Sequence, residues 1–418
     1  MSGPGLLIVG ASQAGVQLAC SVRELGWDGP VTLVGAEPHP PYARPPLSKA
    51  FLTGDATPES LAFRDPAFYE RERITLVLGE TVERLELGDA GRGVAGTASG
   101  RLLPFDRAAL ATGARPRSLS LPGCGLDGVL ALRGLDDAQR LRARVVRQPD
   151  VVVIGGGFVG LEVAGTATAL GCPVTVLEAA PALMGRAVSA ATAQVVQAAH
   201  AAAGVRVLTG VSPERIVGEA GGHVGAVELA DGSRLPAELV VVGIGVRPVD
   251  ELARRAGLAC DDGVVVDACS LASDGHTVAV GDCANLPDPS PVPGPSPRLR
   301  LESVDNAVEQ ARAAASTVVG APRPYRGVPW FWSDQVGIKL QIAGLAAPSD
   351  DVVVRSAGRS GQHVVLRYRG PHLVAAECVN APADFLTVRK ALAAGVRLDR
   401  AAAAATGPIK QLLARADG

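Results

Sequence analysis

The chain of 418 residues is long enough for two or three domains, and its 47% hydrophobic against 20% charged residues allows large buried cores. A formal net charge of -2 gives no support to a nucleic-acid-binding protein, which would carry a basic excess. No apolar run approaches the roughly 18 to 20 residues that span a bilayer, and the first residues lead directly into a predicted strand without the segments of a secretory signal. We therefore expect a cytoplasmic protein without nucleic-acid or membrane partners.

The seven cysteines form no CxxC or CxxxxC pair, and their number is odd. A disulfide framework and a local zinc site are therefore poorly supported. We expect the cysteines to be small buried residues of a protein in a reducing compartment, and we expect no metal site. The cysteines are Cys20, Cys124, Cys172, Cys260, Cys269, Cys283 and Cys378.

Two segments of the chain, residues 5–37 and 151–178, repeat one pattern. Each has an apolar run, a glycine-rich turn, a stretch rich in alanine and leucine, a second apolar run and a glutamate. This order predicts a strand–helix–strand unit, and apolar runs without alternation are typical of strands buried on both faces of a parallel sheet. We predict an α/β fold with two Rossmann-like dinucleotide-binding domains.

The second repeat carries a complete GxGxxG motif at Gly155, Gly157 and Gly160. The first glycine forms the turn, the second lets the backbone approach a pyrophosphate, and the third lets helix and strand pack closely. The helix N-terminus would supply N–H groups to the phosphates. Glu178 ends the next predicted strand, where it can accept from both ribose hydroxyls and would repel a 2′-phosphate, so NADH is favoured over NADPH. A purely structural glycine turn is the alternative.

The first repeat differs in that Ser12 replaces the middle glycine between Gly10 and Gly15. Serine is small, so close phosphate approach can survive, and its hydroxyl could bond a phosphate oxygen. Glu37 at the expected strand end supports a second nucleotide site. Two such sites in one chain predict a bound FAD and an exchangeable NADH, with hydride transfer between them and the flavin supplying the redox chemistry.

Further elements follow the two repeats. Residues 110–116 and 239–248 each predict a strand that ends in a tight turn, and residues 278–282 predict a buried strand that ends in Gly-Asp. The proline-rich residues 287–297 predict a solvated loop, residues 302–319 a helix, and residues 352–355, 363–369 and 373–379 an antiparallel sheet. The predicted domains are an FAD-binding domain in two parts, 1–115 and 245–325, an NAD-binding domain, 116–244, and a C-terminal domain, 326–418.

Over nearly its whole length the chain resembles the oxygenase-coupled NADH-dependent ferredoxin reductases of the putidaredoxin reductase type. The resemblance rests on PPYARPPLSKAFL (Pro40 to Leu52), LATGARPR, GGGFVGLEVA, GIGVRP, VAVGDCA, ESVDNAVEQAR and WFWSDQ (Trp330 to Gln335). It implies a glutathione-reductase-like fold, in which an NAD domain interrupts an FAD domain and an α+β domain follows.

The resemblance also implies which residues contact FAD. Asp282 would hold a ribityl hydroxyl, Lys49 and Pro45 would lie beside the isoalloxazine, and the helix that begins near Ser303 would point its N-terminus at the pyrimidine end of the flavin. The alternative for Lys49 is a solvated surface lysine, and the alternative for Asp282 is a helix cap. The implied FAD residues are Gly10, Ser12, Gly15, Glu37, Arg44, Lys49, Val82, Thr112, Gly113, Arg133, Asp282 and Val304, with Val82 and Val304 acting through their backbones.

At the NAD site, the resemblance places Glu162 near the nicotinamide and Gly245 beside the same half of the dinucleotide. It makes Phe158 an aromatic lid over the flavin that NADH must displace. Trp332 would lie near the flavin edge that faces an iron–sulfur partner. For both aromatic residues a core position is the alternative.

Arg64 and Arg312 match positions that would meet an acidic [2Fe-2S] ferredoxin, although a solvated surface role suits either arginine equally well. The implied activity is that of an NADH:ferredoxin reductase. Two electrons enter FAD as hydride and leave singly to a ferredoxin that serves a monooxygenase, such as a cytochrome P450, or a dioxygenase.

Three other activities are open at this point. A rubredoxin could replace the ferredoxin as acceptor. A disulfide reductase or peroxidase would need a redox cysteine near the flavin, and residues 38–60 contain none. A signalling flavoprotein that interacts with DNA would carry a basic excess, which this chain lacks.

Overall fold

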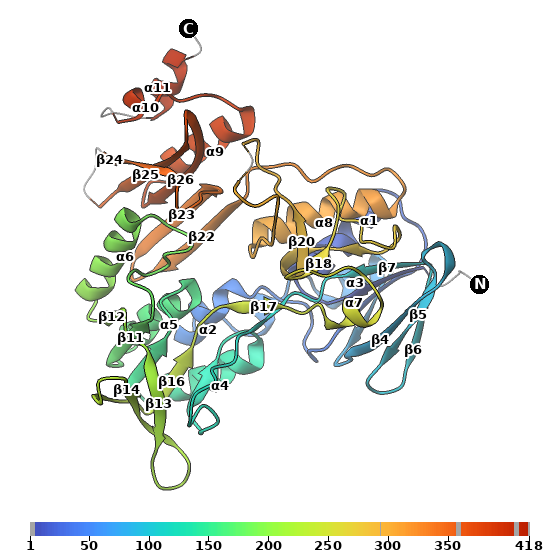
Figure 1. Cartoon of the computed structure of the whole chain (residues 1–418). Helices are drawn as coiled ribbons and strands as arrows, with labels where there is room; N and C mark the ends of the chain where they lie inside the picture. The colour runs from blue at the N-terminus through green and yellow to red at the C-terminus, as the bar shows by residue number, and fades with distance from the viewer. Residues whose placement is uncertain (1–4, 293, 357–360, 405–408, 417–418) are drawn as a thin grey trace. The chain divides into compact units, whose positions relative to one another are not determined.

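The computed structural model describes residues 5–292, 294–356, 361–404 and 409–416 (Figure 1). Two compact units make up the chain. The first unit comprises Met1–Ala43, Pro58–Arg115 and Arg247–Trp330, and the second comprises Arg44–Thr57, Pro116–Val246 and Phe331–Gly418.

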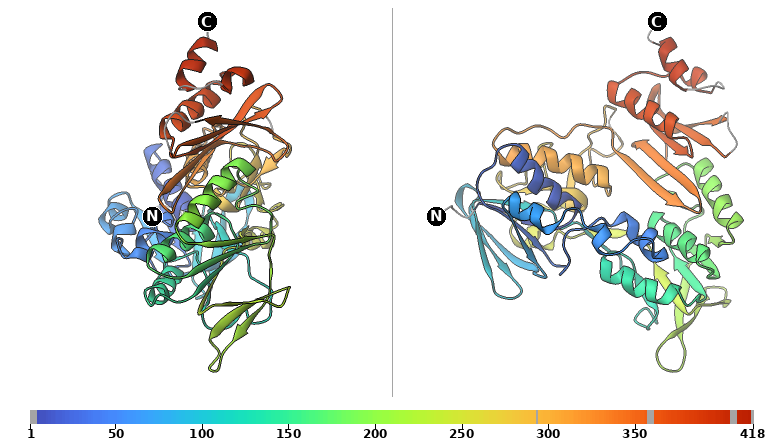
Figure 2. Two further views of the ribbon diagram at one scale, coloured as in Figure 1. Left: turned by 90° about the vertical axis from the view of Figure 1, so that its left-hand side faces the viewer. Right: turned by 180° about the vertical axis from the view of Figure 1, so that it is seen from behind.

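A five-stranded parallel sheet forms the centre of the first unit. Its apolar strands are buried, and helices α1 (Gln13–Glu24) and α8 (Val304–Val318) lie side by side against it (Figure 2). In sheet order the strands are β19 (Val278–Ala279), β7 (Arg107–Leu110), β1 (Leu6–Val9), β2 (Val31–Gly35) and β3 (Ile74–Leu78).

Smaller elements complete the first unit. They are an antiparallel sheet of β4 (Val82–Leu87), β5 (Gly93–Thr97) and β6 (Leu102–Phe105), a sheet of β18 (Val264–Val265), β20 (Ala284–Pro287) and β21 (Arg298–Leu299), helices α3 (Pro66–Arg71) and α7 (Glu251–Arg255), and 3-10 turns η2 (Glu59–Leu61), η3 (Asp89–Gly91) and η4 (Gly281–Cys283).

The second unit contains another five-stranded parallel sheet. In sheet order its strands are β12 (Arg206–Thr209), β11 (Val174–Glu178), β10 (Val151–Ile154), β16 (Leu239–Val242) and β9 (Val129–Ala131). Around it are helices α2 (Ala50–Thr53), α4 (Leu135–Val145), α5 (Phe158–Ala169) and α6 (Ala190–Ala202), the turn η1 (Pro45–Ser48), and an antiparallel sheet of β13 (Pro213–Gly218), β14 (Val224–Leu229) and β15 (Arg234–Pro236).

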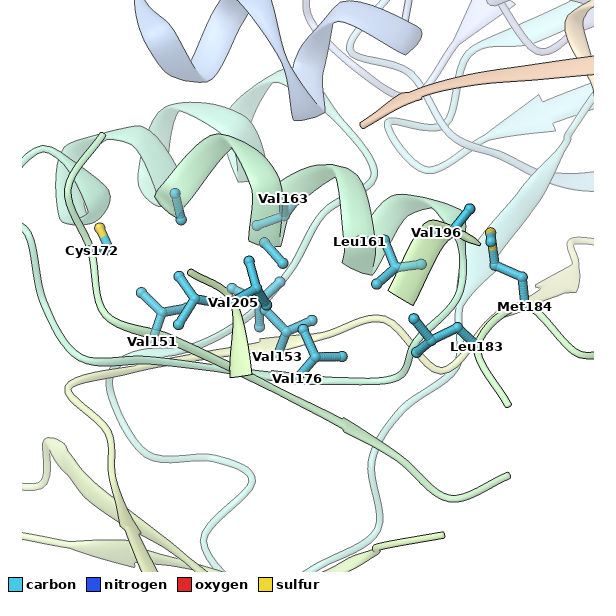
Figure 3. Close-up of a cluster of buried hydrophobic side chains, with 14 of the residues drawn as sticks. Val151, Val153, Leu161, Val163, Cys172, Val176, Leu183, Met184, Val196 and Val205 are labelled. Carbon is cyan, nitrogen blue, oxygen red and sulfur yellow. The ribbon is translucent and has the colours of Figure 1, made fainter. Parts of the chain in front are cut away.

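The C-terminal part of the second unit is a five-stranded sheet that shares a core with the parallel sheet. Figure 3 shows part of this core, in which Val151 and Val153 of β10 pack against Leu161 of α5, and Leu340 and Val379 of the C-terminal sheet belong to the same cluster. In sheet order the strands are β22 (Trp330–Gln335), β23 (Ile338–Gly344), β26 (His372–Val379), β25 (His363–Arg369) and β24 (Asp351–Ser356), followed by α9 (Pro382–Ala394), α10 (Arg400–Ala403) and α11 (Ile409–Ala416).

Most predicted elements are confirmed, including both repeats, the helix now seen as α8 and the three antiparallel C-terminal strands. The tight turns predicted within residues 110–116 and 239–248 are confirmed, but the second strand that follows each turn was not predicted. β7 ends at Leu110 and β16 at Val242, and the chain re-forms as the paired strands β8 (Ala114–Pro116) and β17 (Val246–Pro248). The interruption follows from Gly113 and Gly245, whose φ angles of +69° and +96° are incompatible with an extended strand.

A buried ion pair ties the C-terminal sheet to the start of helix α6. Glu377 of β26 is 1% exposed and accepts hydrogen bonds from the backbone N–H of Ser189 at 2.9 Å and from its hydroxyl at 2.6 Å. Arg367 of β25 adds a contact of 2.8 Å to the same carboxylate. Ser189 is the N-cap of α6, so the charge of Glu377 lies where the helix dipole favours an anion.

Replacing Glu377 with alanine should strongly destabilise the second unit, because Arg367 would remain buried without its partner. We expect the free energy of unfolding to fall by about 3–5 kcal/mol, measured by denaturant titration with circular dichroism. Arg400→Ala, which removes an exposed pair with Asp351, is the matched control and should change the melting temperature little. Equal melting temperatures for Glu377→Ala and wild type would contradict this role.

Candidate functional site

The parallel strands of the first unit end at one edge of the sheet, and several of the predicted FAD residues follow these strand ends. The glycine turn of residues 10–15 follows β1, Glu37 follows β2, Thr112 and Gly113 follow β7, and Asp282 follows β19. Ligands of open parallel sheets bind at this carboxyl edge, beside the strand ends.

Steric contact explains the two glycines of the first turn. Gly10 has φ +121°, and a Cβ added there would lie 2.0 Å from the carbonyl oxygen of Ala111. A Cβ on Gly15 would lie 1.9 Å from the oxygen of Gly10. Ser12 is the N-cap of α1 with an extended φ of -126°, a conformation open to any residue, so the serine departs from the motif without backbone strain.

Glu37 is held beside this turn by Tyr42, whose hydroxyl donates to its carboxylate, a contact that sequence reasoning missed. The backbone carbonyl of Glu37 accepts from Gly79 at 3.0 Å. Val82, the first residue of β4, follows Gly79 by three residues in the sequence.

Asp282 lies in the turn η4, close to the start of α1. A Cβ on Gly281, which has φ +75°, would lie 3.0 Å from the Cβ of Ala14. Two residues that sequence reasoning missed hold the turn: Gln310 accepts from Gly281 N–H at 2.8 Å, and Arg300 donates to the Asp282 carbonyl at 3.0 Å.

Helix α8 begins at Val304, and its N-cap Ser303 accepts from the backbone N–H of Asn306 at 3.0 Å. The helix start is therefore where the sequence predicts it. The buried Gln310 on the same helix connects it to the Asp282 turn.

Four of the residues assigned to FAD by resemblance belong to the second unit. Arg44 donates to the carbonyl of Arg133 at 2.8 Å, so the structure brings these two together. Pro45 opens the turn η1, and Lys49 follows it at the start of α2.

The glycine turn of the second unit repeats the steric logic of the first. A Cβ on Gly155, with φ +110°, would lie 2.4 Å from the oxygen of Gly243, and a Cβ on Gly160 would lie 2.3 Å from the oxygen of Gly155. At Gly157 the nearest atom would be 3.9 Å away. The middle position is thus open toward the helix N-terminus, as an approaching pyrophosphate requires.

Glu178, the last residue of β11, is fixed over this turn. Its Oε2 accepts from Gly156 N–H at 2.7 Å and its Oε1 accepts from Ala180 N–H at 2.7 Å. Each carboxylate oxygen has a further acceptor site, so two ribose hydroxyls can still bond to it. Gly245 follows β16 at the same sheet edge.

An ion pair joins Lys49 to Glu162 of α5, with 2.7 Å between Nζ and Oε2. Ser48 donates to the same oxygen at 2.5 Å, and Ser333 of β22 donates to Oε1 at 2.6 Å. Sequence reasoning named the ion pair's members and missed both serines. Their positions in the sequence could have indicated them, because Ser48 directly precedes Lys49 and Ser333 lies in the motif WFWSDQ, from which only Trp332 was chosen.

Phe158, the first residue of α5, packs against Phe331, with 4.4 Å between ring centroids. Trp332 is half-buried and lies 6.5 Å from Phe331, centroid to centroid. Phe331 was missed, although alternation along a strand places it on the same face as Ser333.

Arg64 and Arg312 are both exposed side chains of the first unit. Arg64 lies over the ring of Phe68, 5.2 Å from its centroid, and Arg71 lies 5.6 Å from the same centroid. Arg312 pairs with Glu309 one turn earlier on α8.

Three of the seven cysteines are buried. All seven are free, and burial raises the pKa of the Cys172, Cys283 and Cys378 thiols, which keeps them protonated and poorly nucleophilic. Among the described residues there is no group of three or more histidine, cysteine or acidic side chains that could hold a metal ion. The same part of the chain contains no helix with the length and hydropathy to span a bilayer.

Each unit therefore holds a cradle that fits a dinucleotide: a turn closed by glycines, a helix N-terminus open beside it and a carboxylate at the next strand end. A bound flavin would supply the redox chemistry, and the ion pair of Lys49 with Glu162 of α5 places charged groups beside the second turn.

The chain matches two family models: pyridine nucleotide-disulphide oxidoreductase over residues 4–311 and reductase C-terminal over residues 330–413. It is 43% identical over 403 residues to rhodocoxin reductase of Rhodococcus erythropolis (96% of this chain, 92% of the relative). It is 39% identical over 380 residues to rubredoxin-NAD(+) reductase of Pseudomonas putida (90% and 96%).

Among solved structures, the covalent putidaredoxin reductase–putidaredoxin complex matches with a TM-score of 0.93 and 35% identity, covering 100% of both chains. The resemblance to that type of reductase is thus confirmed across the whole length. The chain belongs to the pyridine nucleotide-disulphide oxidoreductase family, with a reductase C-terminal domain, and is an FAD- and NAD(P)H-dependent oxidoreductase.

Proposed function

We propose that the chain passes electrons from NADH through FAD to a [2Fe-2S] ferredoxin that serves a monooxygenase or dioxygenase. The observation that carries this function is the full-length match to a reductase solved in complex with its redox partner, putidaredoxin. The balanced reaction is NADH plus two oxidised ferredoxins giving NAD⁺, a proton and two reduced ferredoxins. A cytoplasmic location stays a prediction.

In this function the protein binds and orients, and FAD supplies the conversion of a two-electron donor into single electrons. The N–H groups at the starts of α1 and α5 would hold the two pyrophosphates. Glu37 and Glu178 would accept ribose hydroxyls. Lys49 and Glu162 would lie at the reacting rings, with Pro45 beside the flavin and Phe158 yielding its place to the nicotinamide.

Rubredoxin is a second candidate for the acceptor, because a rubredoxin-NAD(+) reductase is 39% identical over 380 residues. Both acceptors require the same reduction of FAD by NADH. They differ in the surface that they present, so parallel assays with a [2Fe-2S] ferredoxin and a rubredoxin decide between them.

NADH should exceed NADPH by at least about tenfold in kcat/KM, since repulsion of a 2′-phosphate by Glu178 is worth roughly 1.4 kcal/mol or more. Ferricyanide reduction with each coenzyme measures the ratio. Glu178→Gln keeps the shape and removes the charge, so it should narrow the difference. Equal efficiencies in the wild type would remove the role given to Glu178.

A variant in which all seven cysteines are replaced by alanine or serine should keep most of its NADH-to-ferricyanide activity. The reason is that burial favours the thiol form at the positions described above, and no cysteine takes part in hydride transfer. Ferricyanide turnover and the visible flavin spectrum are the measurements. Loss of activity in a well-folded single-cysteine variant would restore the disulfide reductase alternative.

Arg64→Glu and Arg312→Glu should slow ferredoxin reduction at low salt and spare ferricyanide reduction, because charge steering acts on the association rate and weakens as salt rises. Cytochrome c reduction coupled through ferredoxin, across an ionic-strength series, measures the effect. Trp332→Ala should impair ferredoxin reduction with less salt dependence, since it removes packing and no charge.

Arg140→Glu is the matched control for the arginine variants. Arg140 pairs with Asp137 at the same spacing as Arg312 with Glu309, and the resemblance assigns Arg140 no contact with the ferredoxin. It should leave ferredoxin reduction unchanged. If both arginine variants match the wild type at every salt concentration, the docking surface lies elsewhere.

A further inference from the structure

One face of strand β22 runs along helix α5. Phe331 contacts Phe158, Ser333 bonds Glu162, and a Cβ on Gly165 would lie 2.9 Å from the side chain of Val336, the residue after the strand. Positions 158, 162 and 165 follow the i, i+4, i+7 stripe of a helix, and 331 and 333 follow the two-residue period of a strand. The C-terminal sheet is thus in register with the residues of α5 that the proposed function places at the reacting rings.

A chain of buried hydrogen bonds extends behind Ser333. Gln335 Nε2 donates to Ser333 Oγ at 2.8 Å, and Gln335 Oε1 lies 3.0 Å from His200 Nε2 on α6. Ser333 and His200 are fully buried, and Gln335 is 4% exposed. These hydrogen bonds therefore connect α6 to Glu162 through side chains that are buried from water.

Donor chemistry fixes the direction of this chain. Because the amide nitrogen of Gln335 can only donate, the single proton of Ser333 is left for Glu162. Because the amide oxygen can only accept, His200 must carry its proton on Nε2. A reversed amide would offer Ser333 two acceptors for its one proton, and would turn a donor nitrogen toward the histidine ring.

His200 is suited to this neutral tautomer. Burial lowers its pKa, which opposes the imidazolium form, and its Nδ1 has no hydrogen-bond partner in the described part of the chain. Such a neutral, buried histidine keeps one orientation, since any rotation would leave the Gln335 oxygen unpaired.

The series of hydrogen bonds from His200 ends at Glu162. Its Oε1 accepts from Ser333, and its Oε2 accepts from Ser48 and pairs with Lys49. Ser48 is itself fixed, since its carbonyl accepts from Thr166 at 2.8 Å. The carboxylate is therefore held from both sides, by η1 on one and by β22 on the other.

We propose that Ser333, Gln335 and His200 are positioning residues that fix the rotamer of Glu162, and through it the ammonium group of Lys49, for hydride transfer. This inference rests on the proposed function, which places Lys49 and Glu162 at the reacting rings. The three residues orient and do not conduct protons, because the amide of Gln335 cannot pass a proton from its oxygen to its nitrogen without changing tautomer.

The first test is single-turnover reduction of the bound flavin by NADH in Ser333→Ala and Gln335→Met. Loss of the fixed rotamer should lower the reduction rate constant about tenfold, since misplacement near the reacting atoms costs rate. The Kd for NAD⁺ should change by less than about twofold, since the glycine turn and Glu178 are untouched. Ser333→Thr restores the hydroxyl and should recover most of the rate.

Asp334→Asn is the matched control, because alternation puts residue 334 on the opposite face of β22. It should reduce at the wild-type rate. The readout independent of turnover is ¹⁵N NMR of the histidine rings, in which His200 should show the Nε2–H tautomer in the wild type and lose its fixed tautomer in Gln335→Met.

The outcomes separate the two proposals. If NADH does not reduce the bound flavin of the wild-type protein, the proposed function is overturned. A wild-type protein that is reduced normally, with Ser333→Ala and Gln335→Met within about twofold of its rate, overturns the positioning role alone. A His200 ring protonated on Nδ1 also overturns it, even if Ser333→Ala proves too unstable to assay.

Discussion

The steric closure of the two glycine turns is the constraint on which the rest of this structure depends. At Gly10, Gly15, Gly155 and Gly160 a side chain would meet a carbonyl oxygen at 1.9 to 2.4 Å. Only at such close approach can a helix begin directly above the end of its strand. Because both sheets are parallel, Glu37 and Asp282 in the first sheet and Glu178 in the second follow strands that end at the same edge as the glycine turn of their own sheet.

The middle position of each turn is under a different demand. At Gly157 the atom nearest to an added Cβ would be 3.9 Å away, so the fold itself does not require glycine there. Ser12 occupies the equivalent place in the first repeat, in an extended conformation. The two sites also hold their carboxylates differently: a tyrosine hydroxyl bonds Glu37, whereas the turn's own N–H bonds Glu178.

Two buried carboxylates tie the C-terminal sheet to helices α5 and α6 of the second unit. Glu377 of β26 reaches the N-terminus of α6, and Glu162 of α5 is met by Ser333 of β22. Removing charges from water is unfavourable unless they are fully paired, so each carboxylate demands a precise fit between sheet and helix. The C-terminal domain is thus part of the framework of the nucleotide unit, with a shared apolar core behind the polar contacts.

The sequence by itself determined the elements whose causes are local. The GxGxxG spacing, the apolar runs and the strand-end glutamates predicted both βαβ units, because turn sterics and burial of a strand on two faces act over a few residues. The motifs from Pro40 to Gln335 also identified the family and the ion pair's members, Lys49 and Glu162. The short strands that follow the turns at Gly113 and Gly245 were not predicted, since the local pattern does not show that the chain resumes strand pairing after a glycine turn.

Only the tertiary structure decided the partners of the polar groups. Tyr42 at Glu37, Arg300 and Gln310 at the Asp282 turn, and the chain from His200 to Glu162 join residues from separate segments. A serine or glutamine in a strand pattern carries no sign of which donor or acceptor it will meet. That choice depends on the approach of distant segments within about 3 Å, a scale that hydrogen bonding resolves and residue type does not.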